Sequence, residues 1–211
     1  MHFLITSGAT REYIDPVRFI SNASTGRMGN ALAHAAIAAG HKVTLITGPT
    51  DLRPAKGAKV INVEAAAEMF SAVKKEFAGC DCLIMSAAVA DYTPVKKRKT
   101  KIKKGSAPVT LTLKPTPDIV RWAGRSKKKQ IVVGYALEDK SIRKNAERKL
   151  QAKNLDMIIA NTPAAIGADT TSVQVKTPSG KWLKMPTARK FAIASRLIRL
   201  IESLLARKGN Y

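Results

Sequence analysis

The sequence is poor in the residues from which several common kinds of site are built. Aromatic residues make up only 5% of the chain, too few for a base-stacking platform to stand out. Its histidines and cysteines include no second pair at zinc-ligand spacing. No apolar run is long enough to cross a bilayer. These shortages argue against a zinc module, a stacking surface for nucleic acid and a membrane span.

The N-terminus lacks the features of an export signal. It reads MHFLITSG, a short strand-like run without a basic segment or a cleavage site. We therefore expect the protein to be cytoplasmic and to have no membrane partner. Cys80 and Cys82 lie two apart, which on a strand points them to one face and would strain a bond between them. We expect both to be simple buried thiols.

Acidic residues are also scarce, at 15 against 37 Lys and Arg, which gives a net charge of +22. Three interpretations are open: nucleic-acid binding, a solvated basic surface, or a site for polyanionic small molecules. Basic residues gather at 96–104 (KKRKTKIKK) and 125–129 (RSKKK), without a zinc-finger or RNA-binding aromatic signature. A nucleic-acid partner is therefore disfavoured, and charge alone does not choose a function.

Alternating strand and helix patterns predict a single α/β domain over residues 1–211, with a parallel sheet covered by helices. The strand segments are continuous apolar runs, as expected when both faces of a sheet are buried. Lys-rich residues 93–106 predict an exposed flap loop, and the alternation over 108–113 predicts a flap strand. We expect strands over 2–7, 42–47, 59–63, 82–86, 131–136 and 155–160, helices over 26–39, 65–77, 117–124, 139–153 and 187–206, and a C-terminal hairpin of 172–176 with 181–185.

In an open parallel sheet, ligands bind beyond the carboxyl ends of the strands. Gly8 follows the first strand and permits a tight turn. Downstream, Asn22, Ser24 and Gly26 lead into a helix, whose N-terminal N–H groups favour anions. The segment is either a phosphate cradle or an ordinary cap with glycines for packing.

Familiar nucleotide motifs are missing or compromised. No G-x-G-x-x-G follows the first strand directly, and no Walker lysine motif is present. Tyr92 and Lys96 have the Y-x-x-x-K spacing of short-chain dehydrogenases, but Pro94 between them disfavours the required helix. An NAD(P)-dependent oxidoreductase on a similar sheet remains the main alternative function.

Two further segments could carry chemistry. After the fourth strand, the small residues of 87–90 leave room for a flat ring, and Asp91 could accept a hydrogen bond or approach a metal ion. It could equally be a turn-forming Asp. The amines of 101–104 could neutralise charge during phosphoryl or nucleotidyl transfer, or they could form a solvated charge run.

Taken in order, five segments resemble one family. They are DPVRFISNASTGRMG (15–29), AAVADY (87–92), KIKK (101–104), PDIV (117–120) and KNLDMIIAN (153–161). The set resembles the phosphopantothenoylcysteine synthetase domain of coenzyme A biosynthesis, in its bacterial CTP-dependent type, from about residue 3 to 161. The resemblance implies a Rossmann-like fold with helices on both faces and a homodimer.

The resemblance also implies a reaction, with CTP as co-substrate and Mg²⁺ as cofactor. The carboxylate of 4′-phosphopantothenate attacks the α-phosphate of CTP, pyrophosphate leaves and an acyl-cytidylate forms. The amine of cysteine then attacks the acyl carbon, which gives the amide and CMP. Because the substrate carboxylate is its own nucleophile, the lack of a Ser–His–Asp or Cys–His arrangement is no obstacle.

Residue by residue, the resemblance implies catalytic roles for Asn22, tied to the acyl-nucleotide intermediate, and for Lys101, the flap lysine that stabilises charge on the α-phosphate. The sequence does not identify the metal ligands or a base for the cysteine amine. Implied nucleotide-binding residues are Gly8, Ser24, Gly26, Gly29, Met85, Ser86, Ala87, Asp91, Lys101, Pro117, Asp118, Ile119, Val120, Tyr135, Lys149 and Lys153.

Some positions depart from the family pattern. Ala9 stands where many members have a second glycine, and Tyr135 where Phe is usual. Leu137 replaces a small residue, and Thr116 stands where Asn is common. No flavin-binding decarboxylase segment precedes Met1, so we expect that pathway neighbour to be a separate protein.

Overall fold

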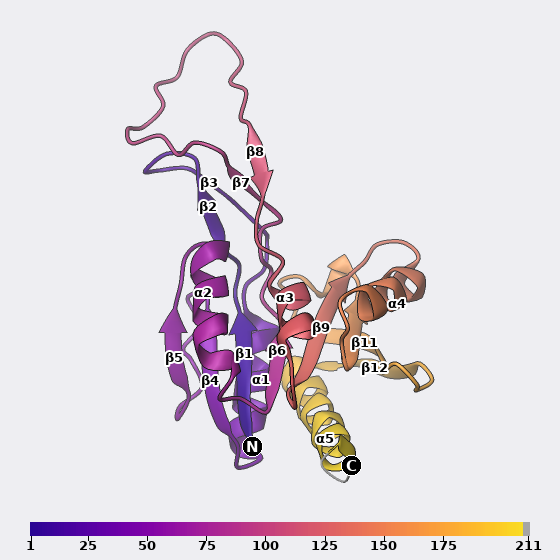
Figure 1. The fold of residues 1–211 in the computed structure, drawn as a ribbon. Coiled ribbons are helices and arrows are strands. Elements are labelled where there is room, and N and C mark those ends of the chain that lie inside the picture. Colours follow the sequence, from indigo (N-terminus) through magenta and orange to yellow (C-terminus); the bar gives the residue numbers. More distant parts are fainter. Residues whose placement is uncertain (209–211) are drawn as a thin grey trace.

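The computed structural model describes residues 1–208 and has a three-layered α/β architecture (Figure 1). Its eight-stranded sheet has the order β12-β11-β10-β9-β6-β1-β4-β5. The first six strands of this sheet along the chain pair in parallel, and β11 and β12 extend it as an antiparallel hairpin. These strands are β1 (His2–Ser7), β4 (Lys42–Thr47), β5 (Lys59–Asn62), β6 (Cys82–Met85), β9 (Ile131–Leu137), β10 (Met157–Asn161), β11 (Thr170–Lys176) and β12 (Leu183–Arg189).

The helices cover both faces of the sheet. One face packs against α1 (Arg27–Ala38) and α5 (Lys190–Lys208). The other packs against α2 (Ala66–Phe77), α3 (Ile119–Ser126) and α4 (Ile142–Ala152). None of the helices within residues 1–208 is both long and apolar enough to span a membrane.

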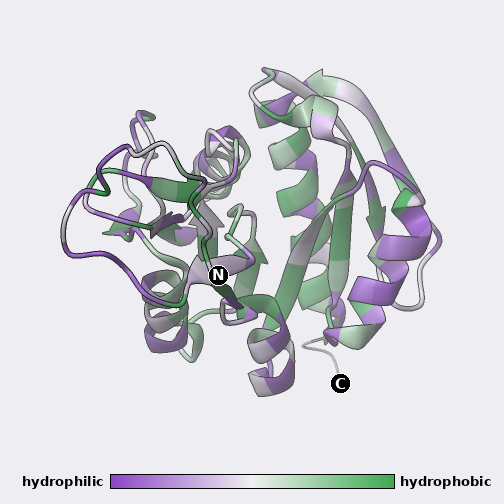
Figure 2. Ribbon diagram, turned by 90° about the horizontal axis from the view of Figure 1, so that it is seen from above, coloured by the Kyte–Doolittle hydropathy of each residue, from purple (hydrophilic) through white to green (hydrophobic). Residues whose placement is uncertain are grey.

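Two hydrophobic cores follow from these layers. Along β1, Phe3 and Ile5 lie in the core beneath α1 and α5, and Leu4 lies in the core beneath α2. This explains why the buried strands read as unbroken apolar runs. Figure 2 shows the central strands as mostly hydrophobic and the arm and outer helix surfaces as largely hydrophilic.

The parallel strands have the order of a dinucleotide-binding sheet. Numbered along the chain, they stand in the order 3-2-1-4-5-6, and the winding direction reverses between β1 and β6. The predicted Rossmann-like fold with helices on both faces and a C-terminal hairpin is confirmed.

An arm projects beyond the carboxyl ends of the strands (Figure 1). It comprises residues 95–112 and rises from a two-stranded sheet of β7 (Tyr92–Pro94) and β8 (Leu113–Pro115). This is the predicted flap loop, but the predicted flap strand over 108–113 is wrong. Of that segment only Leu113 lies in a strand, and the Thr112 carbonyl accepts from the Val95 N–H at 3.0 Å, whereas residues 108–111 pair with no strand of the described chain.

Other boundaries differ by a few residues. The helix predicted over 139–153 begins at Ile142, after Ser141 in a left-handed conformation with φ of 49°. Sequence patterns missed the hairpin of β2 (Arg11–Tyr13) and β3 (Phe19–Ser21), and a 3₁₀ turn, η1 (Pro163–Ala165).

The two cysteines are free and buried, as expected, but they do not share a face. Cys80 precedes β6 and packs in the core beneath α2, and Cys82 lies in the core beneath α1 and α5. Burial raises the pKa of the Cys80 thiol to about 12 and that of Cys82 well above its usual value.

Candidate functional site

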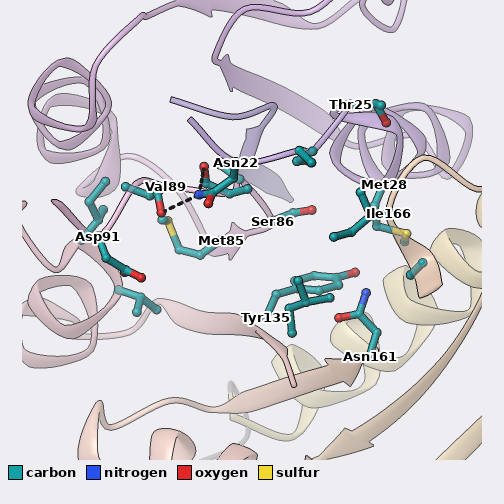
Figure 3. Close-up of a pocket in the computed structure, with 18 of the residues that line it drawn as sticks. Asn22, Thr25, Met28, Met85, Ser86, Val89, Asp91, Tyr135, Asn161 and Ile166 are labelled. Carbon is teal, nitrogen blue, oxygen red and sulfur yellow. Dashed lines mark hydrogen bonds between the residues drawn. The ribbon is translucent and has the colours of Figure 1, made fainter. Parts of the chain in front are cut away.

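A cavity of about 680 Å³ lies at the carboxyl ends of β6, β9 and β10, beside the start of α1 (Figure 3). It adjoins the place where the winding of the sheet reverses, which is where open α/β sheets bind ligands. Its walls come from the loop before α1, the loop after β6, the turn before α3, one face of α4, and the segment from η1 to β11.

Asn22 connects two walls of this cavity. Its Nδ2 donates to the carbonyl oxygens of Ala88 and Val89, both at 3.2 Å. These bonds occupy the amide donors and leave the Oδ1 atom as an acceptor for a ligand. The loop before α1 and the loop after β6 are thus held together by the residue that the resemblance singles out.

The glycines near Asn22 allow close packing of the backbone. A Cβ at Gly29 would lie 2.5 Å from the Ser7 Oγ, and one at Gly8 would lie 2.9 Å from the Gly48 carbonyl oxygen. Gly8 and Gly26 also have φ near +75°, which disfavours other residues. Gly26 is the N-cap of α1, and no side chain of residues 1–208 caps the helix there. The first N–H groups of α1 can therefore donate hydrogen bonds to an anion.

The loop after β6 is fixed from two sides. The Ala87 N–H donates to the Thr6 Oγ1 at 3.1 Å, and the Thr116 Oγ1 donates to the Ala90 carbonyl at 2.6 Å. The Thr116 N–H also donates to the Asp91 carbonyl at 2.9 Å. Thr116, a departure from the family pattern, therefore orders the loop that carries Asp91.

Charged side chains line the α3–α4 wall. Asp118 caps α3 by accepting from the Arg121 N–H at 3.0 Å, and its carboxylate pairs with the Lys153 Nζ at 2.9 Å. Burial alone would raise the pKa of Asp118, but hydrogen bonds from Lys153 and Arg121 lower it. The Lys149 Nζ donates to the Tyr135 carbonyl at 2.8 Å, and burial followed by repulsion from Lys153 lowers its pKa.

The cavity brings together most of the residues that the sequence predicts for the site. Those that line it are Asn22, Ser24, Met85, Ser86, Ala87, Asp91, Pro117, Asp118, Ile119, Val120, Tyr135, Lys149 and Lys153. Gly8, Gly26 and Gly29 lie behind the wall, where they let β1 and α1 approach.

Lys101, for which the resemblance implies a catalytic role, is an exception. It is exposed on the arm and is not among the residues lining the cavity. Its neighbour Ile102 donates its N–H to the Asp15 Oδ2 at 3.1 Å and accepts from the Arg18 Nη1 at 3.2 Å. At this point the arm is thus attached to the β2–β3 hairpin and not to the cavity.

The donor set fits a magnesium ion that arrives with a phosphate ligand. The described residues contain no group of three His, Cys, Asp or Glu side chains able to hold a metal. Asp91 and Asp118 both line the cavity. Because Mg²⁺ is usually held by one or two carboxylates together with substrate phosphates, this arrangement suits it.

Sequence reasoning missed the far wall, formed by Arg27, Met28, Asn161, Ile166, Thr171 and Lys190 among others. Asn161 ends a core strand, so the rule about strand ends could have found it. No local sequence pattern marks Lys190 as a site residue. It reaches the cavity only because the C-terminal hairpin folds back toward it. The Y-x-x-x-K pair is excluded as a helical motif, since Tyr92 belongs to strand β7.

Comparison with known proteins identifies relatives. Residues 1–205 match the family described as the DNA/pantothenate metabolism flavoprotein C-terminal domain. The coenzyme A biosynthesis bifunctional protein CoaBC of Bacillus subtilis is 44% identical over 99% of this chain and 53% of its own. A protein of an unknown prokaryotic organism, named cysteine/cysteine sulfinic acid decarboxylase, is 45% identical over 95% of this chain and 58% of its own. The chain thus spans about half the length of the curated relatives it matches.

Solved structures agree with the fold. The crystal structure of the C-terminal domain of CoaBC has a TM-score of 0.85 and 35% identity, covering 98% of this chain and 96% of that one. The DNA/pantothenate metabolism flavoprotein from Streptococcus pneumoniae has a TM-score of 0.83 and 26% identity, covering 97% and 99%.

Proposed function

The chain belongs to the DNA/pantothenate metabolism flavoprotein C-terminal domain family, and from this premise we propose that it is a phosphopantothenate–cysteine ligase of coenzyme A biosynthesis. One observation carries the proposal. Segments that lie far apart in the sequence, around Asn22, Asp91, Asp118 and Lys149, meet in a single cavity at the reversal point of the sheet. We propose that residues 1–211 act as one domain in this reaction.

The proposed reaction has two balanced steps. A carboxylate oxygen of 4′-phosphopantothenate bonds to the α-phosphorus of a nucleoside triphosphate, and pyrophosphate leaves with the electrons of the broken P–O bond. The cysteine amine then bonds to the acyl carbon, and the nucleoside monophosphate leaves as the amine loses a proton. Holding both substrates in one cavity removes much of the entropic barrier.

The cavity supplies binding and orientation. The proposed nucleotide-binding residues are those of the cavity wall, with Lys149 and Lys153 offering positive charge. The Asn22 Oδ1, which accepts no hydrogen bond from the described residues, can accept one from the incoming amine and orient it toward the acyl carbon. The N-terminus of α1 can receive a phosphate group.

CTP and Mg²⁺ are the proposed co-substrate and cofactor. A nucleotide co-substrate is expected of any ligase of this kind, and CTP follows from the bacterial character of the motifs. Mg²⁺ would screen the charge of the triphosphate when bound, and Asp91 is the carboxylate best placed to meet it, because Asp118 pairs with Lys153. The use of a triphosphate is consistent with a cytoplasmic enzyme.

We propose that the enzyme is a homodimer joined through the arm and the two small sheets beneath it. Large apolar side chains are unusually exposed there, including Val17 at 56%, Val95 at 54% and Val109 at 65%. Exposed apolar clusters of this kind mark interaction surfaces. In such a dimer Lys101 could reach the cavity of the second copy, because it does not line the cavity of its own protomer.

Neither rival activity gains support from the site. The helix that a dehydrogenase would need at Tyr92 is a strand instead. The relative named as a decarboxylase is matched over only 58% of its length, so its name does not carry over to this chain.

The test is to mix the protein with 4′-phosphopantothenate, cysteine, Mg²⁺ and each nucleoside triphosphate in turn. We expect pyrophosphate, with CTP the best donor, and a product whose mass is that of the two substrates joined with loss of water. Absence of that mass with every triphosphate would refute the proposal, and oxidation of a nicotinamide cofactor would favour the oxidoreductase.

A further inference from the structure

A second cavity, of about 620 Å³, lies at the carboxyl ends of β1, β4 and β5, on the other side of β1 from the candidate active site. It opens on the face of the sheet that α1 covers, because Leu45 of β4 lines it and belongs to the core beneath α1 and α5. The two cavities share no lining residue within the described chain. Its volume falls in the range of small-molecule sites, roughly 300–1,000 Å³.

The charge of the second cavity is opposite to that of the first. Glu64 and Glu68 line it, and no Lys or Arg of residues 1–208 does, whereas Lys149 and Lys153 line the first. Neither glutamate forms an ion pair with a described residue. The Glu64 Oε1 accepts from the Tyr13 hydroxyl at 3.1 Å, and the Glu68 Oε2 accepts from the Glu64 N–H at 2.8 Å. Each carboxylate thus keeps one oxygen as an acceptor, and a phosphate or other anion would be repelled.

Asn30 of α1 supplies a third acceptor. Its Nδ2 donates to the Arg53 carbonyl at 3.0 Å. This bond fixes the orientation of the amide, since a carbonyl can only accept. The Asn30 Oδ1 is shielded from solvent and has no partner within residues 1–208. Because buried polar atoms are nearly always hydrogen-bonded, an N–H group from a ligand in the adjoining cavity is the missing partner.

The hydroxyl groups on the wall are also left as acceptors. Those of Ser7, Thr47 and Thr50 donate to backbone carbonyls at 2.9–3.0 Å. Apart from the exposed amide of Asn62, the side chains of this wall therefore have only acceptor capacity to offer. A ligand that fits must be rich in hydrogen-bond donors.

Shape and long-range charge narrow the ligand further. Leu45, Val60 and Pro54 give the wall apolar surface against which a ring can pack. The net charge of +22 repels cations from the whole molecule, so an uncharged donor is favoured over an ammonium group. In sheets with this winding, an acidic side chain in this half of the sheet typically accepts from the hydroxyls of a ribose.

We propose that the second cavity binds an uncharged nucleoside. The ribose hydroxyls donate to Glu64 and Glu68, the base packs against the apolar wall, and an N–H group of the base donates to the Asn30 Oδ1. The inference does not depend on the proposed function, because no residue of the candidate active site enters it.

The first measurement is calorimetric titration of the full chain with adenosine. Glu68→Gln should weaken binding by about tenfold, as expected for loss of a hydrogen bond to a charged group. Asn30→Ala removes the shielded acceptor and should also weaken it. Asp139→Asn neutralises an exposed carboxylate that lines neither cavity and should bind like the wild type. Thermal melting checks that the variants fold, and Glu68 is exposed, so its replacement should not unfold the domain.

The second measurement locates the ligand and tests its charge. Adenosine should slow hydrogen exchange in residues 48–54, which form the wall beside Asn30. AMP at the same concentration should protect this loop less, because its phosphate meets the two glutamates, and 2′-deoxyadenosine should also protect it less. Stronger protection by AMP, wild-type affinity in Glu68→Gln or the absence of adenosine binding would each overturn the proposal. Protection by spermidine in place of adenosine would show a site for cations and overturn it as well.

Discussion

The Asn22 side chain is held in place by the hydrogen bonds that its Nδ2 donates, and we propose that its Oδ1 acts in the reaction. Its Nδ2 donates to two backbone carbonyls, which an aspartate could not do. Asn22→Asp should therefore repel those carbonyls, lose its orientation and stall the second step. We expect acyl-cytidylate to accumulate, detected by mass spectrometry of quenched reactions. Normal turnover by the variant would remove Asn22 from the mechanism.

The expected effect of replacing Gly29 on stability is unusual for a glycine in a helix. Gly→Ala in a helix normally stabilises by about 1 kcal/mol. Here the new Cβ would lie 2.5 Å from the Ser7 Oγ and 2.6 Å from the Ser7 Cβ. Gly29→Ala should instead lower the free energy of unfolding by about 1–3 kcal/mol, measured by urea denaturation.

Gly105→Ala is the matched control for that experiment. A Cβ at Gly105, on the arm, meets nothing within 4 Å, and its φ is not positive. It should leave the stability of the domain unchanged. Equal effects at the two positions would show that the approach of α1 to β1 is not tight.

For single residues, the sequence predicted which residues lie at the site better than it predicted the role of each one. It left the Asn22–Gly29 segment open between a phosphate cradle and a packed turn, and the cradle stays a prediction. Ser24 lines the cavity, and Gly26 and Gly29 lie behind the wall. The sequence did not reveal Lys190 as a cavity residue, because its position depends on how the β11–β12 hairpin before it and α5, which begins at Lys190, pack in the folded chain.

Among the elements, the arm is attached to the β2–β3 hairpin partly through one buried carboxylate, that of Asp15. The side chain of Asp15 is fully buried and accepts from the N–H groups of Val17, Arg18 and Ile102 and from the Arg18 guanidinium. Burial alone would raise the pKa of Asp15, but these donors hold it well below its usual range. The carboxylate therefore stays charged, and its contribution to stability decreases as the pH falls below the ordinary pKa of an aspartate and is lost in strong acid.

Asp15→Asn should loosen the arm without unfolding the sheet. An amide presents one acceptor atom in place of two and cannot satisfy all four donors. We expect faster hydrogen exchange at Ile102 and unchanged exchange in β1, measured by NMR or mass spectrometry. Unchanged exchange at Ile102 would mean that the arm is held by other contacts.

The arm also carries Lys101, the lysine on which we propose that the first step depends. Lys101→Gln should nearly abolish pyrophosphate release and leave the melting temperature unchanged, because the side chain is exposed. Lys104→Gln removes the same charge from an exposed position on the same arm and should retain activity. Wild-type rates for Lys101→Gln would refute its role.

Long, strongly patterned elements were predictable, since their apolar faces must be buried wherever they lie. The short β2–β3 hairpin was not, because strands of three residues carry too little pattern. The alternation over 108–113 was misleading for a physical reason. Val109 and Leu111 pair with no strand within residues 1–208 and stay 65% and 41% exposed.

For the whole molecule, the exposed apolar residues of the arm predict its oligomeric state. Val109→Lys with Leu111→Lys should convert a dimer into a monomer, measured by sedimentation velocity. Phe191→Lys, at a side chain 52% exposed on α5, should leave the dimer intact. A wild-type monomer at all concentrations would contradict the proposed assembly and require the arm to fold onto its own cavity.

The most direct test of the whole account is exchange of labelled pyrophosphate into CTP in the absence of cysteine. If a carboxylate displaces pyrophosphate in the first step, exchange needs 4′-phosphopantothenate and Mg²⁺ but no amine. It should persist in Asn22→Asp and vanish in Lys101→Gln. Product formation without any such exchange, or exchange that does not need 4′-phosphopantothenate, would contradict an acyl-cytidylate formed in this cavity.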